Sequence, residues 1–328
     1  MNRTAKIVLI AVVALAVVIA AALAGMLAFG TSAPPEPLAS LSAPFRTVDF
    51  SNLPPVQTLK VSHRSPIAYR DWLPNPAPSD PPLVVIAIHG SSAQSASMHP
   101  LGKALSAAGI PVYAPDIRGH GDTGIRGDID YAGELDDDMA DFTAMMRGKY
   151  PNSKLVLMGF SSGGGYALHV AATPLGRMFA RTVLLSPMLG AFAPTYRQDG
   201  NYAKPFIARI IALAVLDRAG IHAFDHLTTL LLAIDPARTD ILVGHYSWLL
   251  MRAFGTRDYA ADVRNAQMPL AVVDGEKDEL FFADKFAPTI DAVRPGVPVT
   301  IVPGLSHTGL TVDPSAVPVI LAAVRGSS

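Results

Sequence analysis

The chain has 328 residues, 50% of them hydrophobic and 16% charged, with 26 basic and 27 acidic side chains and a formal net charge of −1. A nearly neutral chain lacks the basic surface that nucleic-acid binding requires, so we expect no DNA or RNA partner. The absence of cysteine excludes a disulfide framework, a cysteine nucleophile, an iron–sulfur centre and a thiolate zinc site. The high apolar content predicts that much of the chain is buried or lies in lipid.

The first element along the chain is an unbroken apolar run of about 23 residues, at positions 7–29. At about 1.5 Å per residue, a helix of this length reaches roughly 35 Å and can cross a bilayer core. Arg3 and Lys6 precede the run and the next cation is Arg46, so the positive-inside rule places the N-terminus in the cytoplasm. We therefore expect residues 1–30 to be a single-pass membrane anchor with the rest of the chain outside. The alternative is a cleaved signal and a secreted protein.

Residues 31–44 are rich in proline, serine and alanine, which predicts an extended linker to a single outer domain at residues 45–328. In this domain short aliphatic runs alternate with helix-length segments, as is typical of parallel strands covered by helices on both faces. An antiparallel hairpin is expected at the edge, from residues 59–61 and 67–72. The fold class is therefore α/β, doubly wound. The predicted parallel strands are residues 83–88, 111–115, 154–159, 182–186, 270–274 and 297–302.

Residues 134–149 show how a helix is specified in this domain. Apolar side chains recur at helical spacing, at Leu135, Met139, Phe142 and Met146. Acidic residues occupy the first turn and basic residues the last, which matches the helix macrodipole. The spacing and the charge order both predict a helix over this segment.

About 80 residues with no strand signal lie between the predicted strands 182–186 and 270–274, too many for a simple crossover helix. We expect an inserted helical cap at about residues 190–265, with strongly apolar helices near 206–216, 227–234 and 248–251. A cap this apolar favours an acyl chain over a sugar or a charged metabolite.

Residues 159–163 read Gly-Phe-Ser-Ser-Gly and fit the motif G-x-S-x-G. The motif follows a predicted strand and precedes a helix-like segment that begins near Gly164, which is the setting of a nucleophile elbow. Glycines flank the serine because so tight a turn leaves no room for side chains near its backbone. The setting predicts Ser161 as a nucleophile.

A serine hydroxyl needs a base that takes its proton, and an acid that holds the base in one tautomer. With this elbow the order along the chain is serine, acid, histidine. The predicted strand 270–274 leads into acidic residues, and the predicted strand 297–302 leads into His307. Both candidates therefore lie at the carboxyl ends of strands, where ligands bind in open α/β sheets. We assign Asp278 as the acid and His307 as the base. Asp274 and Glu276 are rivals for the acid, although Asp274 is expected to lie within its strand.

A tetrahedral intermediate needs two backbone N–H groups directed at its oxyanion. One is expected from Ser162, which follows the nucleophile. The other is expected from the loop after the strand 83–88, which reads His-Gly-Ser-Ser; Gly90 permits a sharp turn, and the amide of Ser91 is the best-placed donor. His89 is predicted to brace this loop. This chemistry requires no metal and no cofactor.

In combination and order, these residues resemble α/β-hydrolase-fold serine hydrolases of the monoacylglycerol lipase, lysophospholipase and serine aminopeptidase-like (S33) group. The resemblance implies an α/β-hydrolase fold in which residues 116–121 form a structural loop near the site, so His120 is not assigned a catalytic role. One departure is that Asp122 and Thr123 stand where a serine often follows the glycine. The resemblance rests on residues 89–91, 114–122, 159–163, 275–278 and 306–307.

The leading hypothesis is a membrane-anchored serine esterase or lipase that cleaves carboxylic esters of hydrophobic acyl groups, carried by small molecules or lipids, through an acyl-enzyme. The same triad acting on amides or thioesters is an alternative. A non-catalytic binding protein of this fold is disfavoured, because it has no reason to keep the serine, acid, histidine and oxyanion-loop glycine together. Dehalogenase and epoxide hydrolase chemistry is disfavoured because Ser161 stands where those elbows carry aspartate.

Overall fold

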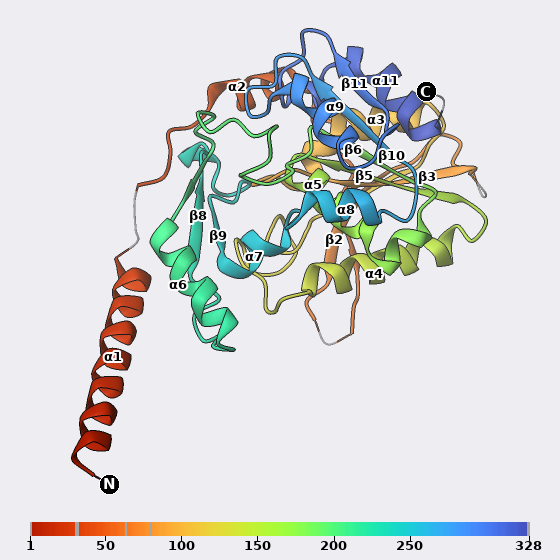
Figure 1. Ribbon diagram of the computed structural model, residues 1–328. Coiled ribbons are helices and arrows are strands. Elements are labelled where there is room, and N and C mark those ends of the chain that lie inside the picture. Colours follow the sequence, from red (N-terminus) through yellow and green to blue (C-terminus); the bar gives the residue numbers. More distant parts are fainter. Residues whose placement is uncertain (1, 30–32, 63, 79–80, 327–328) are drawn as a thin grey trace.

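The computed structural model describes residues 2–29, 33–62, 64–78 and 81–326. Figure 1 shows a central sheet with helices on both sides, a smaller cap beside it, and an N-terminal helix that extends away from the body. The central sheet has eight strands in the order β1-β2-β4-β3-β5-β6-β10-β11. In chain order they are β1 (Gln57–Leu59), β2 (Ile67–Trp72), β3 (Leu83–Ile88), β4 (Val112–Pro115), β5 (Lys154–Phe160), β6 (Arg181–Leu185), β10 (Leu270–Gly275) and β11 (Val299–Val302).

The strand pairing confirms the predicted α/β class. β2 runs antiparallel to its neighbours β1 and β4, and the remaining neighbouring pairs of this sheet are parallel. The six predicted parallel strands are all present, with ends that differ from the prediction by at most two residues. The predicted edge hairpin is β1 and β2, and β1 lies two residues earlier than expected.

Helices cover both faces of the sheet because its central strands are apolar on both sides. In β5, Leu155 and Leu157 face one core, whereas Val156 and Met158 face the other. The first core includes α4 (Glu134–Lys149), α5 (Ser162–Ala172) and α9 (Ala283–Asp291), and the second includes α3 (His99–Ala107) and α11 (Val317–Arg325). Each fully buried aliphatic side chain contributes about 1.5–3 kcal/mol. The two cores therefore fix the position of the sheet, and with it the loops that follow the carboxyl ends of its strands. A short helix, α10 (Gly309–Val312), follows one of these loops.

The cap differs from its prediction. It contains a three-stranded antiparallel sheet of β7 (Ala203–Pro205), β8 (Thr228–Leu232) and β9 (His245–Ser247), together with α6 (Ile207–Arg218), α7 (Trp248–Ala253) and α8 (Tyr259–Asn265). The expected helix over residues 227–234 is wrong, since β8 occupies most of that segment. Its five residues begin with two threonines, which favour extended backbone, and they pair with both β7 and β9. The cap is therefore mixed rather than helical.

The N-terminal helix α1 (Arg3–Ala28) has 26 residues and a mean hydropathy of 3.2 over an 18-residue window, none of which is buried. It is long and apolar enough to cross a membrane, and a signal sequence has the same properties. Its last turns contact α6, where Arg209 Nε donates a hydrogen bond of 2.9 Å to the carbonyl oxygen of Leu27.

The segment after α1 is only partly the extended linker that was expected. Residues 39–47 are helical, as α2 (Ala39–Ser42) and a following 3-10 turn (Ala43–Thr47). The predicted boundary between anchor and linker, at residues 30–31, lies outside the described residues.

Candidate active site

The turn between β5 and α5 holds Ser161 in a strained backbone conformation, with φ 56° and ψ −121°. A non-glycine residue at positive φ costs about 1–3 kcal/mol and persists only where its surroundings enforce it. Here three backbone hydrogen bonds do so. The Ser161 N–H donates to Leu185 O at 2.9 Å, and the Ser161 carbonyl accepts from Gly165 N at 3.0 Å and Met188 N at 2.9 Å. The enforced turn fixes the backbone that carries the Ser161 hydroxyl.

The two flanking glycines are required by close backbone contacts. A Cβ at Gly159 would lie 2.1 Å from the carbonyl oxygen of Gly163, and a Cβ at Gly163 would lie 2.2 Å from the carbonyl oxygen of His89. Both contacts are with backbone atoms that cannot rotate away. The elbow therefore packs directly against the loop that follows β3.

Ser161, His307 and Asp278 lie in one hydrogen-bonded row, although they come from three distant segments. The Ser161 hydroxyl lies 3.0 Å from His307 Nε2, and His307 Nδ1 lies 2.6 Å from Asp278 Oδ2. The second Asp278 oxygen accepts from the backbone N–H groups of Leu280 at 2.7 Å and Phe281 at 2.9 Å. The three side chains that the sequence singled out are thus brought together.

The surroundings of the row set its protonation. Burial would raise the pKa of Asp278, but the attraction of His307 and hydrogen bonds from His307 and the Leu280 amide lower that pKa below its ordinary value. Asp278 is therefore a carboxylate, and it holds the imidazole proton on Nδ1 so that Nε2 faces the serine. Phe160 and Phe281 pack on the imidazole, with ring centroids 4.7 Å and 5.2 Å from that of His307. These contacts fix the ring and exclude water.

The rival acids bond elsewhere. Asp274 is fully buried at the end of β10 and accepts a hydrogen bond from the Ser186 hydroxyl. Burial and the neighbouring charge of Asp278 raise the pKa of Asp274 to about 9, so this carboxyl is neutral at pH 7. Glu276 accepts from the Gly304 amide at 2.8 Å. Asp278 is therefore the carboxylate that contacts the imidazole.

The sequence did not single out Glu279, which follows Asp278 directly. Its carboxylate accepts a hydrogen bond of 2.9 Å from the backbone N–H of His307. Because this contact is to the backbone of His307, it anchors the loop and does not orient the imidazole ring. Adjacency to the predicted acid was the one signal that could have indicated it.

The two expected oxyanion donors lie on segments that meet beside Ser161. The hydroxyls of Ser91 and Ser162 are hydrogen-bonded to each other, and a Cβ at Gly90 would lie 3.2 Å from the Cβ of Ser161. His89 braces this loop as predicted. Its Nε2 accepts from the Ile117 amide at 3.0 Å, which leaves the proton on Nδ1 to donate to the Gly90 carbonyl at 2.8 Å.

Residues 116–121 form a buried loop held by its own side chains. Asp116 accepts from the amides of Ser95 at 2.6 Å and Asp122 at 3.1 Å. His120 is fully buried, and burial lowers its pKa well below the usual value, so its ring is neutral. Thr123, at the departure from the family pattern, accepts from the Ala68 amide at 2.9 Å and so ties the loop to β2.

Two cap tyrosines that the sequence did not single out reach the loop after β3. The Tyr246 hydroxyl accepts from the Ser92 amide at 2.9 Å, and the Tyr202 hydroxyl donates to Ser92 Oγ at 2.9 Å. More than one hundred residues separate each tyrosine from Ser92 along the chain, so no local pattern could have indicated these contacts.

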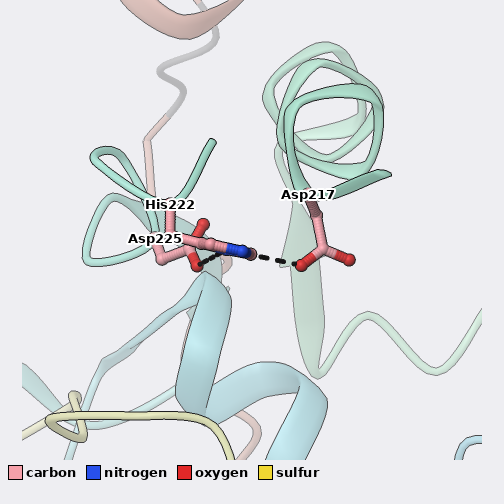
Figure 2. Close-up of side chains that lie close together, drawn as sticks. All are labelled: Asp217, His222 and Asp225. Carbon is pink, nitrogen blue, oxygen red and sulfur yellow. Dashed lines mark hydrogen bonds and ion pairs between the residues drawn. The ribbon is translucent and has the colours of Figure 1, made fainter. Parts of the chain in front are cut away.

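A second group of polar side chains lies on the cap, away from this row. Figure 2 shows Asp217, at the end of α6, with His222 and Asp225 from the loop that follows. His222 Nδ1 lies 3.0 Å from Asp225 Oδ2 and 3.7 Å from Asp217 Oδ1, a spacing that could hold a cation. Asp217 is also paired with Arg252 at 2.9 Å, however, and a cation would have to compete with this guanidinium. We assign the group to the structure of the cap edge.

Comparisons with known proteins identify the family and the fold. Residues 79–314 match the family model described as serine aminopeptidase, S33. A monoacylglycerol lipase from Mycolicibacterium smegmatis (strain ATCC 700084 / mc(2)155) is 27% identical over 252 residues, which cover 74% of this chain and 85% of the relative.

Two solved structures share the fold. A soluble variant of monoglyceride lipase from Saccharomyces cerevisiae, in complex with a substrate analog, has a TM-score of 0.61 at 15% identity and covers 85% of this chain and 97% of its own. A monoacylglycerol lipase from Paleococcus ferrophilus has a TM-score of 0.57 at 18% identity and covers 79% of this chain and 97% of its own. The chain therefore belongs to the serine aminopeptidase S33 family and is a serine hydrolase of the α/β-hydrolase fold, similar to lipases and esterases.

Proposed function

We propose that this chain is a membrane-anchored serine hydrolase that cleaves carboxylic esters of hydrophobic acyl groups. The observation that carries the proposal is the continuous hydrogen-bonded row from the Ser161 hydroxyl through His307 to the Asp278 carboxylate. In this proposal Ser161 is the nucleophile, His307 the general base and acid, and Asp278 the group that orients the imidazole and stabilises its positive charge.

Acylation begins when Ser161 Oγ attacks the ester carbonyl carbon and passes its proton to His307 Nε2. The carbonyl electron pair moves onto oxygen, where the backbone N–H groups of Ser91 and Ser162 stabilise the charge. Collapse of this intermediate breaks the bond to the alcohol, which takes the proton from His307. Water then gives a proton to His307 and attacks the acyl-enzyme, and a second collapse releases the acid and returns the proton to Ser161.

The composition of the cap supports a hydrophobic acyl group. Large apolar side chains dominate its interior, and others stay exposed on α6, where Ile207, Ile211 and Val215 are 59%, 50% and 43% exposed. The monoacylglycerol lipase relative points to the same class of substrate. An acyl chain gains most of its binding energy by leaving water, so an apolar surface of this kind favours it over a charged metabolite.

We further propose that α1 is an uncleaved anchor, with the N-terminus in the cytoplasm and the hydrolase domain outside. Arg3 and Lys6 lie in its first turn, and its last turns contact α6 of the cap. Cleavage beyond residue 30 would remove this contact. Carbonate extraction of membranes and the intact mass of the purified chain test the anchor. A soluble protein that lacks its first 30 or so residues would favour the secreted alternative.

A substrate panel tests the reaction class on the full chain in detergent. Esters, thioesters and anilides that carry the same acyl group are compared at several acyl lengths, with Ser161→Ala and the exposed Ser315→Ala as a matched pair of variants. We expect the highest kcat/KM on long-chain esters, a loss of at least about 10³-fold in Ser161→Ala, and no loss in Ser315→Ala. Preference for the thioester or the anilide would instead indicate a thioesterase or a peptidase. A folded wild type that turns over none of them would indicate a binding protein.

A further inference from the structure

The loop after β3 is held by the cap as well as by the sheet. Ser92 follows the expected oxyanion donor Ser91, is 3% exposed, and has a positive φ of 63°, a conformation that a serine adopts only under constraint. Each of its polar groups bonds to a cap residue. Its N–H donates to Tyr246 Oη at 2.9 Å, its carbonyl accepts from Val243 N at 2.9 Å, and its hydroxyl accepts from Tyr202 at 2.9 Å.

The proton positions along this contact follow from the partners. His120 Nδ1 lies 3.1 Å from the Ile117 carbonyl and must donate to it, so His120 Nε2 is an acceptor. The Tyr246 hydroxyl, 2.7 Å from Nε2, therefore donates to His120 while it accepts from Ser92. The result is a continuous series of hydrogen bonds that runs from the Ser92 amide through Tyr246 to His120, in the loop at residues 116–121.

The second tyrosine acts on the same turn. Besides Ser92 Oγ, the Tyr202 hydroxyl lies 3.3 Å from the carbonyl oxygen of Ser91. Burial raises the pKa of Tyr202 to about 12, so the hydroxyl keeps its proton at neutral pH. The backbone on the C-terminal side of Ser91 is thus hydrogen-bonded to the cap, through the Ser91 carbonyl and the Ser92 amide. The Ser91 hydroxyl is hydrogen-bonded to Ser162, beside the nucleophile.

We propose that Tyr246 and Tyr202 are positioning residues that hold the Ser91 amide in place, so that the oxyanion hole is complete only while the cap is docked on the sheet. Neither hydroxyl contacts Ser161 or His307, so both would act through the loop. This inference rests on the proposed function. A hydroxyl that holds a donor affects the transition state, in which the oxyanion exists, far more than the ground state.

The test removes the hydroxyls singly and together, as Tyr246→Phe, Tyr202→Phe and the double variant. Tyr150→Phe is the matched control, because its hydroxyl is also buried and hydrogen-bonded, at 2.7 Å to Tyr113, but lies in the core under α4. We expect kcat to fall by about 10- to 100-fold in Tyr246→Phe with KM within about threefold, as for a displaced oxyanion donor. Tyr150→Phe should keep wild-type kcat.

A transition-state analogue separates positioning from mere folding. An alkyl boronic acid forms a tetrahedral adduct with the serine and places an oxygen where the oxyanion would be, so its Ki should rise in proportion to the loss of kcat/KM across the tyrosine variants. Unchanged kcat and Ki in the double variant would overturn the inference, and so would a fall in kcat with no change in Ki. If the wild type itself showed neither turnover nor boronic acid binding, the proposed function would fail first.

Discussion

The contact between the elbow and the loop after β3 makes Gly163→Ala a sharp test of how the site is built. The new Cβ would lie 2.2 Å from the His89 carbonyl oxygen, 2.8 Å from Ile88 Cγ2 and 2.9 Å from the Ile88 carbonyl oxygen. Cβ atoms are essentially never found closer than 3.0 Å to such atoms, so α5 and the loop must separate by about 0.8 Å. This movement carries Ser91 away from Ser161.

The displacement has two measurable costs. Overpacking of this kind destabilises a protein by about 1–3 kcal/mol. A donor misplaced by nearly 1 Å costs about 10²-fold in rate, and complete loss of one oxyanion donor costs about 10²- to 10³-fold. We therefore expect kcat for a p-nitrophenyl ester to fall by about 10²- to 10³-fold in a variant that is still folded at 25 °C.

The assay compares kcat and the urea midpoint of Gly163→Ala with those of Gly148→Ala. Gly148 lies in α4, where a Cβ would meet nothing within 4 Å. That control should keep wild-type kcat and gain up to about 1 kcal/mol of stability, because alanine favours a helix. If Gly163→Ala kept kcat within about threefold of wild type, the reasoning that couples the elbow to the oxyanion loop would be refuted.

Three further predictions concern the charges in and near the site. Arg118→Met removes the guanidinium that lies 2.7 Å from Asp138 and 3.2 Å from the fully buried Glu134. Urea denaturation should show that the free energy of unfolding falls by about 3–5 kcal/mol, and adding Glu134→Gln should recover part of it. A fall below about 1 kcal/mol would contradict this prediction. Asp274 has a folded pKa of about 9, above its unfolded value of 3.8, so its contribution to stability is complete below pH 3.8 and is lost as pH rises to about 9. Relative to wild type, Asp274→Asn should therefore gain up to about 1.4 kcal/mol of stability for each pH unit between 5 and 8, and parallel profiles would show that Asp274 is not neutral. Asp278→Asn should lower kcat by roughly 10⁴-fold because an amide stabilises the wrong imidazole tautomer, whereas Glu276→Gln should lower it less than about threefold; equal losses would reject the assignment of the acid.

Much of the fold and of the candidate site follows from local patterns. The strands β3, β5 and β10 were predictable because a continuous apolar run in a parallel sheet is buried on both faces. Helix α4 was predicted with its observed bounds, Glu134–Lys149, because apolar spacing and terminal charges agree there. Asp278 and His307 could be chosen because strand ends in such a sheet converge on one edge.

What local patterns could not supply is pairing between distant segments. The Thr-Leu run of β8 suits a short helix as well as a strand, and its extended form is stabilised by β7 and β9, which lie elsewhere in the chain. The contact of Tyr246 with Ser92 spans 154 positions. Nothing near either residue in the sequence indicates the other, so the link between cap and oxyanion loop was visible only in three dimensions.

The most direct test of the central claim is to locate a covalent adduct. The full chain is treated with a fluorophosphonate, digested with trypsin and analysed by fragmentation of the peptide 155–177, which contains both Ser161 and Ser162. We predict one phosphonyl group on Ser161 in the wild type, and no adduct on that peptide in Ser161→Ala. An unmodified wild type, an adduct on another residue, or equal modification of Ser161→Ala would contradict the account.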